Sequence, residues 1–435
     1  MKRKLLLITI LLVGGLFVSC SNDDSGNTEN PVLPEIKEPL PITITELTSD
    51  FVINGENLEL KGTNFVNKDY PTKVFINQTE VVPNEITNTK ILLISPNVKT
   101  GTNTIRIQID KVNSVPLNFF VLAKGWNKLT VLGDATIANS TVFDNSQTIF
   151  SLVNWSNPVK LAPKSSGFIQ TTLNPATNEM ASFQMYDEKT GVFVTATEAF
   201  FSNDSFNTSN KINIDNNFNP VSTRLMIGSL NNDGCLLYSS FGAHIFTKDN
   251  GATIIKNEAP DFAKINKTNV FTTRLAVHAF GKSSSNGKFY QLGKIYDFVK
   301  YGSTLKNIVM ESETGYSNWV VKDSISNADG NKSGYKFVNI NKILSVDYYN
   351  KTLLMSTDVT KTWTSIKTDV SNIFLRTETQ WYIQSGDKIF VTKDSGLTWE
   401  LELELPAGSV INNISFSKTK IIVSGNKGLH YLKLE

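Results

Sequence analysis

Residues 392–399 read TKDSGLTW, and this stretch decides the fold of the larger part of the 435-residue chain. Residues 356–363 (STDVTKTW) and 247–254 (TKDNGATI) align with it. Asp394 follows Asp358 by 36 residues, and Asp358 follows Asp249 by 109 residues, about three such units. A period of this length is typical of architectures that repeat one small sheet.

Each copy of the repeat carries side chains that suit a turn. We expect the aspartate to accept hydrogen bonds from turn amides, the glycine to supply a positive φ, and the tryptophan to pack between sheets. The residues in these roles are Asp249, Gly251, Asp358, Trp363, Asp394, Gly396 and Trp399. The alternative, that the aspartates are catalytic acids, is disfavoured because a carboxylate at one position of every unit cannot converge on one site. Two degenerate copies are Ser202-Asn203-Asp204 with Thr208, and Ser312-Glu313-Thr314 with Trp319.

This motif resembles the Asp-box, or bacterial neuraminidase repeat, of sialidase-like β-propellers. The resemblance implies that residues 122–435 form a propeller, with each box in the turn between the third and fourth strands of a blade. At about 36 to 50 residues per blade, this length favours seven blades, with six or eight as alternatives.

The end of the chain predicts how the ring closes. After the last box come three strand-like segments, 411–416, 420–423 and 429–434, with no further box. Segment 126–132 resembles the strand that follows the last box, 399–403. Because an open sheet edge invites aggregation, we expect segment 126–132 to supply the missing outer strand.

Residues 39–121 show another pattern, in which short alternating segments are separated by turn residues. This spacing predicts a β-sandwich. The segments 62–65 (GTNF), 74–77 (VFIN), 89–96 (TKILLISP) and 101–105 (GTNTI) resemble the IPT/TIG family of immunoglobulin-like domains. We expect Gly62 to allow a tight turn and Phe65 to fill the core, and the resemblance implies a spacer or binding module. The predicted fold class is therefore all-β, an immunoglobulin-like sandwich followed by a propeller.

The N-terminus predicts export. Lys2-Arg3-Lys4 precedes an apolar run from Leu5 to Val18, which is too short to span a bilayer, and Ser19-Cys20 follows. The pattern resembles a bacterial lipoprotein processing site, with residues 1–19 as signal peptide and Cys20 as the lipid attachment site. The alternative is an ordinary secretory signal with an incidental cysteine. The composition of residues 20–38 predicts a flexible tether. The acidic residues after Cys20 resemble the surface-export signal of Bacteroidota lipoproteins. This resemblance implies a lipid-anchored protein of the outer membrane that is exposed at the cell surface.

Composition excludes several function classes. A net charge of +2 gives no reason to expect nucleic acid as a partner. With Cys20 lipidated, Cys235 stands alone and is expected to be a small core residue. We assign no metal site and no cofactor, because only His244, His278 and His430 could assist and residues 327–331 read as a polar turn. Ser324, in Asp323-Ser324-Ile325, fits an O-glycosylation pattern of exported Bacteroidota proteins, whereas the sequon Asn139-Ser140-Thr141 has little meaning in a bacterium.

The sequence assigns no catalytic residue. A sialidase needs three arginines around the substrate carboxylate, and the predicted propeller has three, Arg224, Arg274 and Arg376, which we expect at strand ends. No arginine occurs between residues 107 and 223, where the first of the triad should lie. Another glycosidase would need two facing carboxylates, which the sequence neither identifies nor excludes. We therefore predict non-catalytic binding of a glycan or a protein, with an envelope glycoside hydrolase as the alternative.

Overall fold

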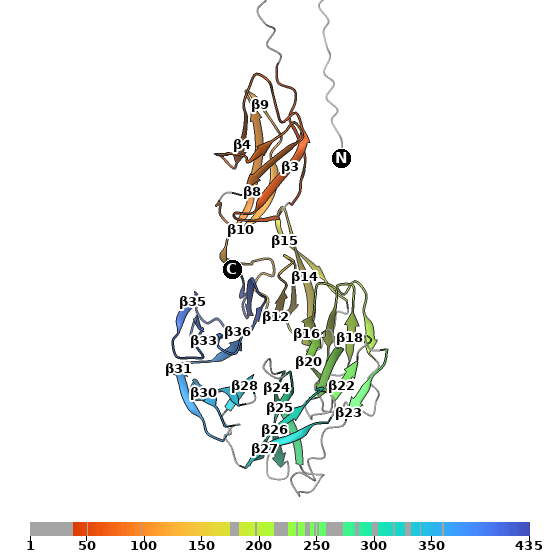
Figure 1. Cartoon of the computed structure of the whole chain (residues 1–435), viewed down its shortest axis with the longest axis vertical. Helices are drawn as coiled ribbons and strands as arrows, with labels where there is room; N and C mark the ends of the chain where they lie inside the picture. The colour runs from red at the N-terminus through yellow and green to blue at the C-terminus, as the bar shows by residue number, and fades with distance from the viewer. Residues whose placement is uncertain are drawn as a thin grey trace, which may run out of the picture. The chain divides into compact units, whose positions relative to one another are not determined.

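The computed structural model describes residues 38–435 apart from 50, 96, 175–181, 196–197, 213–224, 232–233, 240–243, 248, 250–251, 258–272, 283–286, 298–302, 316–317, 327–331, 340 and 359–360. The chain divides into two compact units, Met1–Leu40 and Pro41–Glu435, and only 38–40 of the first is described. The described part of the second unit contains strands and no helix (Figure 1), so it offers no helix that could cross a membrane. The all-β prediction is confirmed.

The first part of the second unit is a sandwich of two sheets. One sheet has the strand order β1-β3-β7-β6, and the other has the order β2-β10-β8-β4-β5 with β9 paired to β8. Most neighbours are antiparallel, whereas β10 pairs with β2 in parallel. The strands are β1 (Thr43–Leu47), β2 (Phe51–Ile53), β3 (Asn57–Thr63), β4 (Thr72–Ile76), β5 (Thr79–Val81), β6 (Glu85–Ile86), β7 (Lys90–Ile94), β8 (Gly101–Ile109), β9 (Val112–Asn113) and β10 (Leu117–Leu122).

Alternation along these strands builds the sandwich core. In β8 the inward residues Ile105, Ile107 and Ile109 are buried, while the residues between them are partly exposed. Phe65 is fully buried in the same cluster, as expected. Gly62 does not serve a tight turn, however. It lies inside β3, where a Cβ would come within 2.0 Å of the Thr43 carbonyl oxygen, so its role is to let β1 approach closely.

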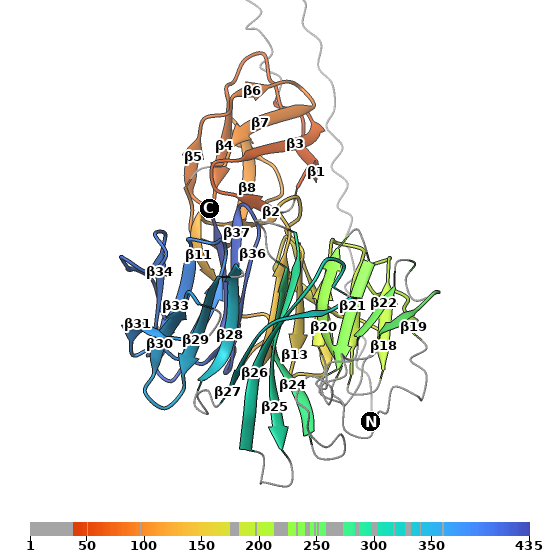
Figure 2. The ribbon, with the colours of Figure 1, turned by 60° about the horizontal axis from the view of Figure 1, so that its bottom comes forward.

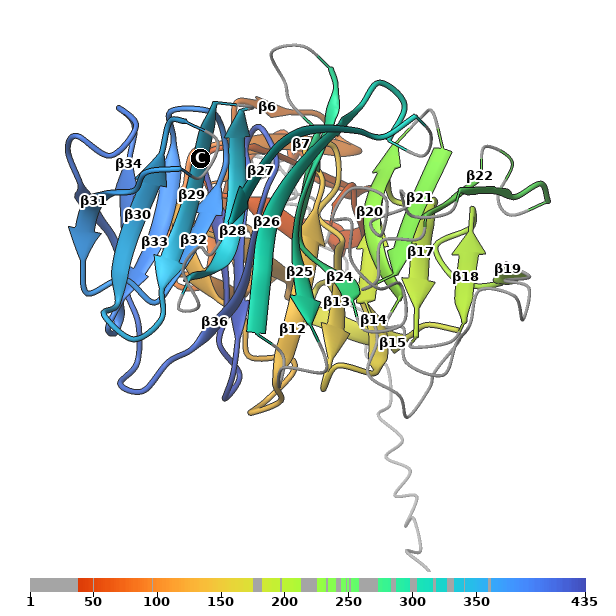
Figure 3. The same cartoon turned by 90° about the horizontal axis from the view of Figure 1, so that it is seen from below.

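In the described part of the chain, the remaining strands form seven four-stranded antiparallel sheets, which are the blades of a propeller (Figures 1 and 3). Their strands are β12 (Ile137–Val142), β13 (Ile149–Val153), β14 (Asn157–Lys164) and β15 (Gly167–Thr172) in blade 1; β16 (Ser182–Met185), β17 (Gly191–Val194), β18 (Ala199–Ser202) and β19 (Asn210–Ile212) in blade 2; β20 (Leu225–Asn231), β21 (Gly234–Ser239), β22 (His244–Thr247) and β23 (Ile255–Asn257) in blade 3; β24 (Thr273–Lys282), β25 (Phe289–Asp297), β26 (Ser303–Ser312) and β27 (Val320–Ser326) in blade 4; β28 (Lys332–Asn339), β29 (Lys342–Asp347), β30 (Thr352–Ser356) and β31 (Thr364–Thr368) in blade 5; β32 (Asn372–Leu375), β33 (Trp381–Ser385), β34 (Lys388–Thr392) and β35 (Glu400–Glu404) in blade 6; and β36 (Ile411–Phe416), β37 (Lys420–Gly425), β38 (His430–Leu434) and β11 (Gly125–Lys128) in blade 7.

Burial within a blade follows strand position. The first strands of neighbouring blades contact one another around the ring. Second strands such as β13 (IFSLV) and β37 (KIIVSG) are buried along their whole length, because adjacent blades cover both faces. Outer strands such as β35 (ELELE) have no buried residue. Third strands, which end at the repeat turns, are partly buried, as in β34 (KIFVT), where Ile389, Val391 and Thr392 are buried.

Strand β11 closes the ring, as predicted. It pairs antiparallel with β38, with Trp126 opposite Lys433, so the final sheet joins one strand from the start of the propeller to three from its end (Figure 2). The paired strand is shorter than the predicted segment 126–132, since it covers Gly125–Lys128 and a turn follows. Trp126 Nε1 donates to the Glu402 carbonyl oxygen and to its carboxylate, both at 3.1 Å, which ties blade 7 to blade 6.

Polar contacts fasten blade 7 to blade 1. The buried Lys420 ammonium donates to the carbonyl oxygens of Phe143, Asp144 and Ser146 in one loop of blade 1. His430, which has no exposed surface, lies 3.1 Å from Ser140 Oγ through Nε2. Ser140 Oγ in turn lies 2.7 Å from Ser151 Oγ. The seam between the two ends of the propeller is therefore a buried, hydrogen-bonded contact.

Candidate functional site

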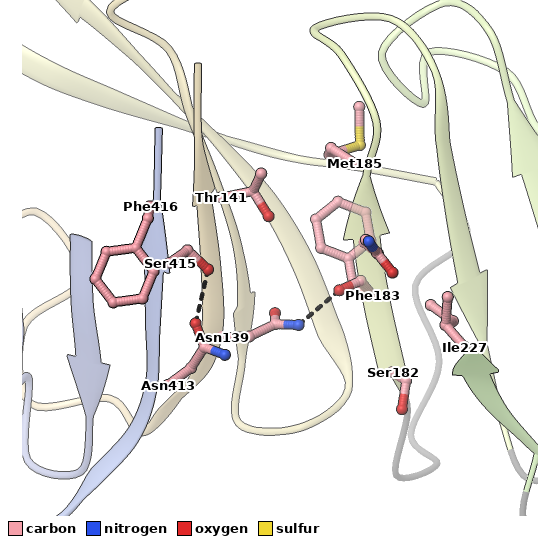
Figure 4. A pocket seen from close by; sticks show the side chains of 10 residues that line it. Asn139, Thr141, Ser182, Phe183, Met185, Ile227, Asn413, Ser415 and Phe416 are labelled. Atoms are coloured by element: carbon pink, nitrogen blue, oxygen red, sulfur yellow. Dashed lines mark hydrogen bonds between the residues drawn. The ribbon is translucent and has the colours of Figure 1, made fainter. Parts of the chain in front are cut away.

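A cavity of about 500 Å³ opens among the first strands of blades 7, 1, 2 and 3 (Figure 4). This volume falls within the range of about 300–1,000 Å³ that is usual for small-ligand pockets. Its lining residues are Asn139 and Thr141 of β12, Ser182, Phe183, Gln184 and Met185 of β16, Ile227 of β20, and Asn413, Ser415 and Phe416 of β36. The cavity therefore combines both ends of the propeller sequence.

Bulges in β12 and β36 position the two asparagines of the cavity lining. The β12–β13 register shifts between Ile137 and Asn139, and the β36–β37 register shifts at the corresponding place, between Ile411 and Asn413. A β-bulge bends its strand and changes the direction of the side chains that follow it. From these points, alternate residues Asn139 and Thr141, and likewise Asn413 and Ser415, face the cavity.

Some of the lining side chains are held by hydrogen bonds. Asn139 Nδ2 donates to the Phe183 carbonyl oxygen at 2.6 Å and so links blade 1 to blade 2 (Figure 4). Ser415 Oγ donates to Asn413 Oδ1 at 2.8 Å (Figure 4). These bonds fix the two walls of the cavity. The amide nitrogen of Asn413 makes no hydrogen bond to the described residues.

Other lining groups have no hydrogen-bond partner among the described residues. The side chains of Thr141, Ser182 and Gln184 are partly exposed and make no hydrogen bond to the residues that the structure describes. Together with the Asn413 amide nitrogen, they supply uncharged donors and acceptors to the cavity. Such groups exchange hydrogen bonds with water until a ligand replaces it.

Apolar side chains complete the wall. Phe416 is partly exposed, and its ring packs at 5.0 Å from that of Tyr382, which fixes its orientation. Phe183 and Met185 are buried apart from small exposed fractions of 2% and 3%, and Ile227 is partly exposed. The cavity can therefore meet a ligand that has both polar and apolar surfaces.

No charged side chain lines the cavity among the described residues. Arg376 lies behind Phe416, with its guanidinium 6.0 Å from the ring centroid, but it donates to the carbonyl oxygens of Ser417 and Lys418 and pairs with Glu435 at 2.7 Å. It directly follows β32, and Arg274 is the second residue of β24, so both lie at strand ends. Arg224 lies outside the described residues. No arginine triad is assembled in the part of the chain that the structure describes.

The repeat aspartates all lie in the turn between the third and fourth strands of their blades, away from the cavity lining. Asp394 accepts hydrogen bonds from Thr398 N at 2.9 Å, Thr398 Oγ1 at 2.5 Å and Thr392 Oγ1 at 2.7 Å. Asp358 and Asp249 accept the same three bonds, as does Asp204 of the degenerate copy in blade 2. The threonine hydroxyl, followed by the threonine amide, lowers the pKa of Asp394 and of Asp358 to about 2. These carboxylates are therefore ionised acceptors at neutral pH.

The other residues of the repeat lie as follows. Gly396 has φ +91°, a conformation that favours glycine, and Gly251 lies outside the described residues. Trp399 packs against the cluster shared by blades 5 and 6, and Trp363 against the cluster shared by blades 4 and 5. In blade 2, Phe206 takes the glycine position with φ +59° and is buried 5.5 Å from the Phe183 ring. Ser209 stands there in place of the tryptophan, so Phe206 fills the space between blades and supports the cavity wall.

The remaining predicted residues do not line the cavity, although Ile227 of the lining packs against the cluster that contains Cys235. Ser324 lies in β27, opposite Ile308 of β26, and Cys20 lies outside the described residues. Cys235 is buried in the core, and burial raises the pKa of its thiol to about 12. Among the described residues, no group of three or more His, Cys, Asp or Glu side chains could hold a metal ion.

Sequence reasoning missed the cavity residues. The signal that could have found them is a pair of polar residues at i and i+2 in the first strand of three blades: Asn139 and Thr141, Ser182 and Gln184, and Asn413 and Ser415. The first of these pairs belongs to the sequon Asn139-Ser140-Thr141.

Comparisons with known proteins define the class. A model of the IPT/TIG domain matches residues 42–121, and a comparison with curated proteins gives no match. Among solved structures, "YCF48 bound to D1 peptide" is 15% identical, with a TM-score of 0.52 over 72% of this chain and 97% of that chain. YCF48 from Cyanidioschyzon merolae is 12% identical, with a TM-score of 0.53 over 71% of this chain and 99% of that chain.

A third structure covers more of the chain. An auxiliary nutrient binding protein from Bacteroides thetaiotaomicron VPI-5482 is 9% identical over 92% of this chain and 98% of that chain, but its TM-score of 0.39 carries no argument. The described residues thus form an all-β structure with an IPT/TIG domain and a propeller of seven sheets, and this structure is similar in fold to YCF48.

Proposed function

We propose that this chain is a cell-envelope protein whose propeller binds a glycan or a protein without chemical conversion, and that the cavity among β12, β16, β20 and β36 is the binding site. One observation supports this proposal most directly. The described lining has neutral polar groups that make no hydrogen bond to the described residues, and it has no charged side chain. Groups of this kind can hold a ligand by hydrogen bonds but cannot transfer a proton at neutral pH.

Hydrolysis has less support. A glycosidase uses two carboxyl groups that flank the scissile bond, and the described lining of the cavity contains no carboxyl group. The envelope glycoside hydrolase therefore remains the weaker candidate.

The anchoring part of the proposal comes from the sequence. We place a lipid on Cys20, a signal peptide at residues 1–19, a tether at 20–38 and exposure at the outer-membrane surface. The IPT/TIG domain would then act as a spacer, and the Asp-box aspartates as turn staples, which agrees with the hydrogen bonds that they accept.

The test is ligand capture by the full chain and by a cavity variant. We would apply wild type, Gln184→Ala and the control Gln170→Ala to arrays of glycans and peptides, since Gln170 lies on the exposed side of β15. The proposal predicts one ligand class that wild type and the control retain and that Gln184→Ala loses. Retention by all three proteins would contradict it, and release of cleaved sugar would favour the hydrolase.

A further inference from the structure

We infer that the cavity takes an uncharged saccharide and discriminates against sugars that carry a carboxylate. This inference rests on the proposed function and names the ligand class of the same site. It follows from the arrangement of polar groups, the apolar patches beside them and the charges around the cavity.

The polar groups form a grid. Three first strands, β36, β12 and β16, each contribute two polar residues at i and i+2 to the lining: Asn413 and Ser415, Asn139 and Thr141, Ser182 and Gln184. Residues two apart on a strand are separated by about 6.5 Å. Asn139 belongs to the wall, since its Nδ2 donates to the Phe183 carbonyl oxygen and its Oδ1 is buried without a partner among the described residues. The side chains of Thr141, Ser182 and Gln184 and the amide nitrogen of Asn413 remain, and they offer hydrogen bonds along β16 and across to β12 and β36.

A saccharide matches such a grid in chemistry. Each sugar hydroxyl both donates and accepts, and the amide and hydroxyl side chains of Gln184, Thr141 and Ser182 also do both. None of these three side chains is committed to the described part of the protein. An extended peptide offers backbone donors and acceptors along one line, as in its addition to a sheet edge. A two-dimensional set of side-chain partners therefore favours a saccharide over a peptide.

The apolar residues fit the other side of a sugar ring. A pyranose carries C–H groups on its faces, which pack on aromatic and aliphatic surfaces. Phe416 is held by Tyr382, and Ile227 lies on β20 across the cavity. Both are partly exposed, so both can contact a bound ring.

The charges argue against an acidic sugar. A carboxylate that leaves water needs a cation or several donors, because burying an unpaired charge is costly. The described lining contains no lysine, arginine or histidine. Arg376, behind Phe416, already pairs with Glu435 and two carbonyl oxygens, and this pairing raises the pKa of its guanidinium further above an already high value. Its Nη2 atom therefore already has three acceptors, and Arg376 is not among the residues that line the cavity.

The experiment compares matched ligands and matched variants. A glycan array probed with the full chain identifies the tightest neutral glycan. Isothermal titration then measures Kd for that glycan and for its counterpart with one uronic acid in place of a neutral hexose. The cavity variants are Gln184→Ala, Asn413→Ala and the near-isosteric Thr141→Val. Gln170→Ala and Asn118→Ala are controls on exposed surfaces, and thermal melting verifies that each variant is folded.

We expect at least tenfold weaker binding of the acidic counterpart, at least tenfold weaker neutral binding by Gln184→Ala, several-fold weaker binding by Thr141→Val and unchanged binding by the controls. Equal affinity for the acidic counterpart, or no neutral glycan with a Kd below 1 mM, would overturn the inference. A peptide ligand that Gln184→Ala loses would overturn the saccharide assignment but leave the proposed function standing. A ligand that every cavity variant retains would overturn both.

Discussion

Asp394 joins the end of β34 to the start of the next strand through one carboxylate. Its two oxygens accept three hydrogen bonds from Thr392 and Thr398, and Gly396 occupies the left-handed region between them. The turn thus uses an ionised acceptor and a permissive backbone position rather than buried apolar surface.

Asp394→Ala should lower the midpoint of thermal unfolding without abolishing ligand binding. The substitution removes the acceptor of Thr398 N and of the Thr392 and Thr398 hydroxyls. The turn before Trp399 therefore loses the side-chain hydrogen bonds that hold it. Scanning calorimetry of the full chain measures the midpoint, with Gln170→Ala on exposed β15 as the control. An unchanged midpoint together with lost turnover of a sugar would instead assign Asp394 to catalysis.

His430 makes stability depend on pH. Complete burial lowers the pKa of its imidazole from about 6.5 to about 3, and Nδ1 has no partner among the described residues. Below pH 6.5 the imidazole of His430 binds a proton in the unfolded chain but stays neutral in the folded chain. The free energy of unfolding should therefore fall as pH decreases from about 6.5 toward 3, by at most about 1.4 kcal/mol per pH unit.

Denaturant unfolding at pH 7.5, 6.0 and 5.0 measures this slope. His430→Gln keeps a polar group beside Ser140 but cannot take up a proton, so its free energy of unfolding should be lower at pH 7.5 and flatter with pH. Equal slopes for both proteins would show that other groups cause the acid sensitivity.

At the scale of elements, the seam is the vulnerable part of the propeller. Only β11 completes blade 7, and it comes from more than 300 residues before its partner β38. Trp126 packs in the cluster shared by blades 6 and 7 and donates to Glu402, whose carboxylate also accepts from Lys433 at 2.7 Å. One strand therefore carries contacts to two blades.

Trp126→Ala should destabilise the propeller by roughly 2–4 kcal/mol, toward the lower end for a core tryptophan because Trp126 is partly exposed. Deleting residues 122–133 should cost more, since it also opens the edge of β38. Equilibrium unfolding gives both values, with Tyr349→Ala as the control because that side chain is 74% exposed. A loss under 1 kcal/mol for Trp126→Ala would show that the seam does not depend on this strand.

The elements also show what the sequence could predict. The length of residues 122–435 favoured seven blades, with six or eight as alternatives, and the three strands after the last repeat predicted closure by the segment that contains β11. The cavity could not be predicted in the same way, because it depends on the register shifts before Asn139 and Asn413 and on bringing β36 beside β12. Phe206 could not be predicted either. A bulky residue at the glycine position suggests that the repeat is lost, yet Phe206 has the positive φ of the turn and packs in the core.

On the scale of the whole molecule, the sandwich meets the propeller through an apolar cluster. Phe51 and Phe120 stack at 6.1 Å, and Phe168 of β15 contacts both rings. Thr100 Oγ1 donates to Asn127 Oδ1 at 2.7 Å beside them. These contacts join the IPT/TIG segment to blades 1 and 7.

Cys20→Ser should abolish lipid attachment if the N-terminus is processed as proposed. The thiol is the only acceptor for the acyl-bearing group, and the hydroxyl of serine does not replace it in this reaction. Metabolic labelling with a fatty-acid probe should mark the wild type and leave the variant unlabelled, released or unprocessed. Equal labelling of the two proteins would exclude lipidation at Cys20.

The central claim is that the propeller binds its ligand in the cavity between β12, β16 and β36. A crystal structure of the full chain with its tightest ligand tests this most directly. We predict ligand density within hydrogen-bond distance of Gln184 and Asn413 and in contact with the Phe416 ring. Density on the outer strands or on the sandwich, with the cavity holding only water, would contradict the account.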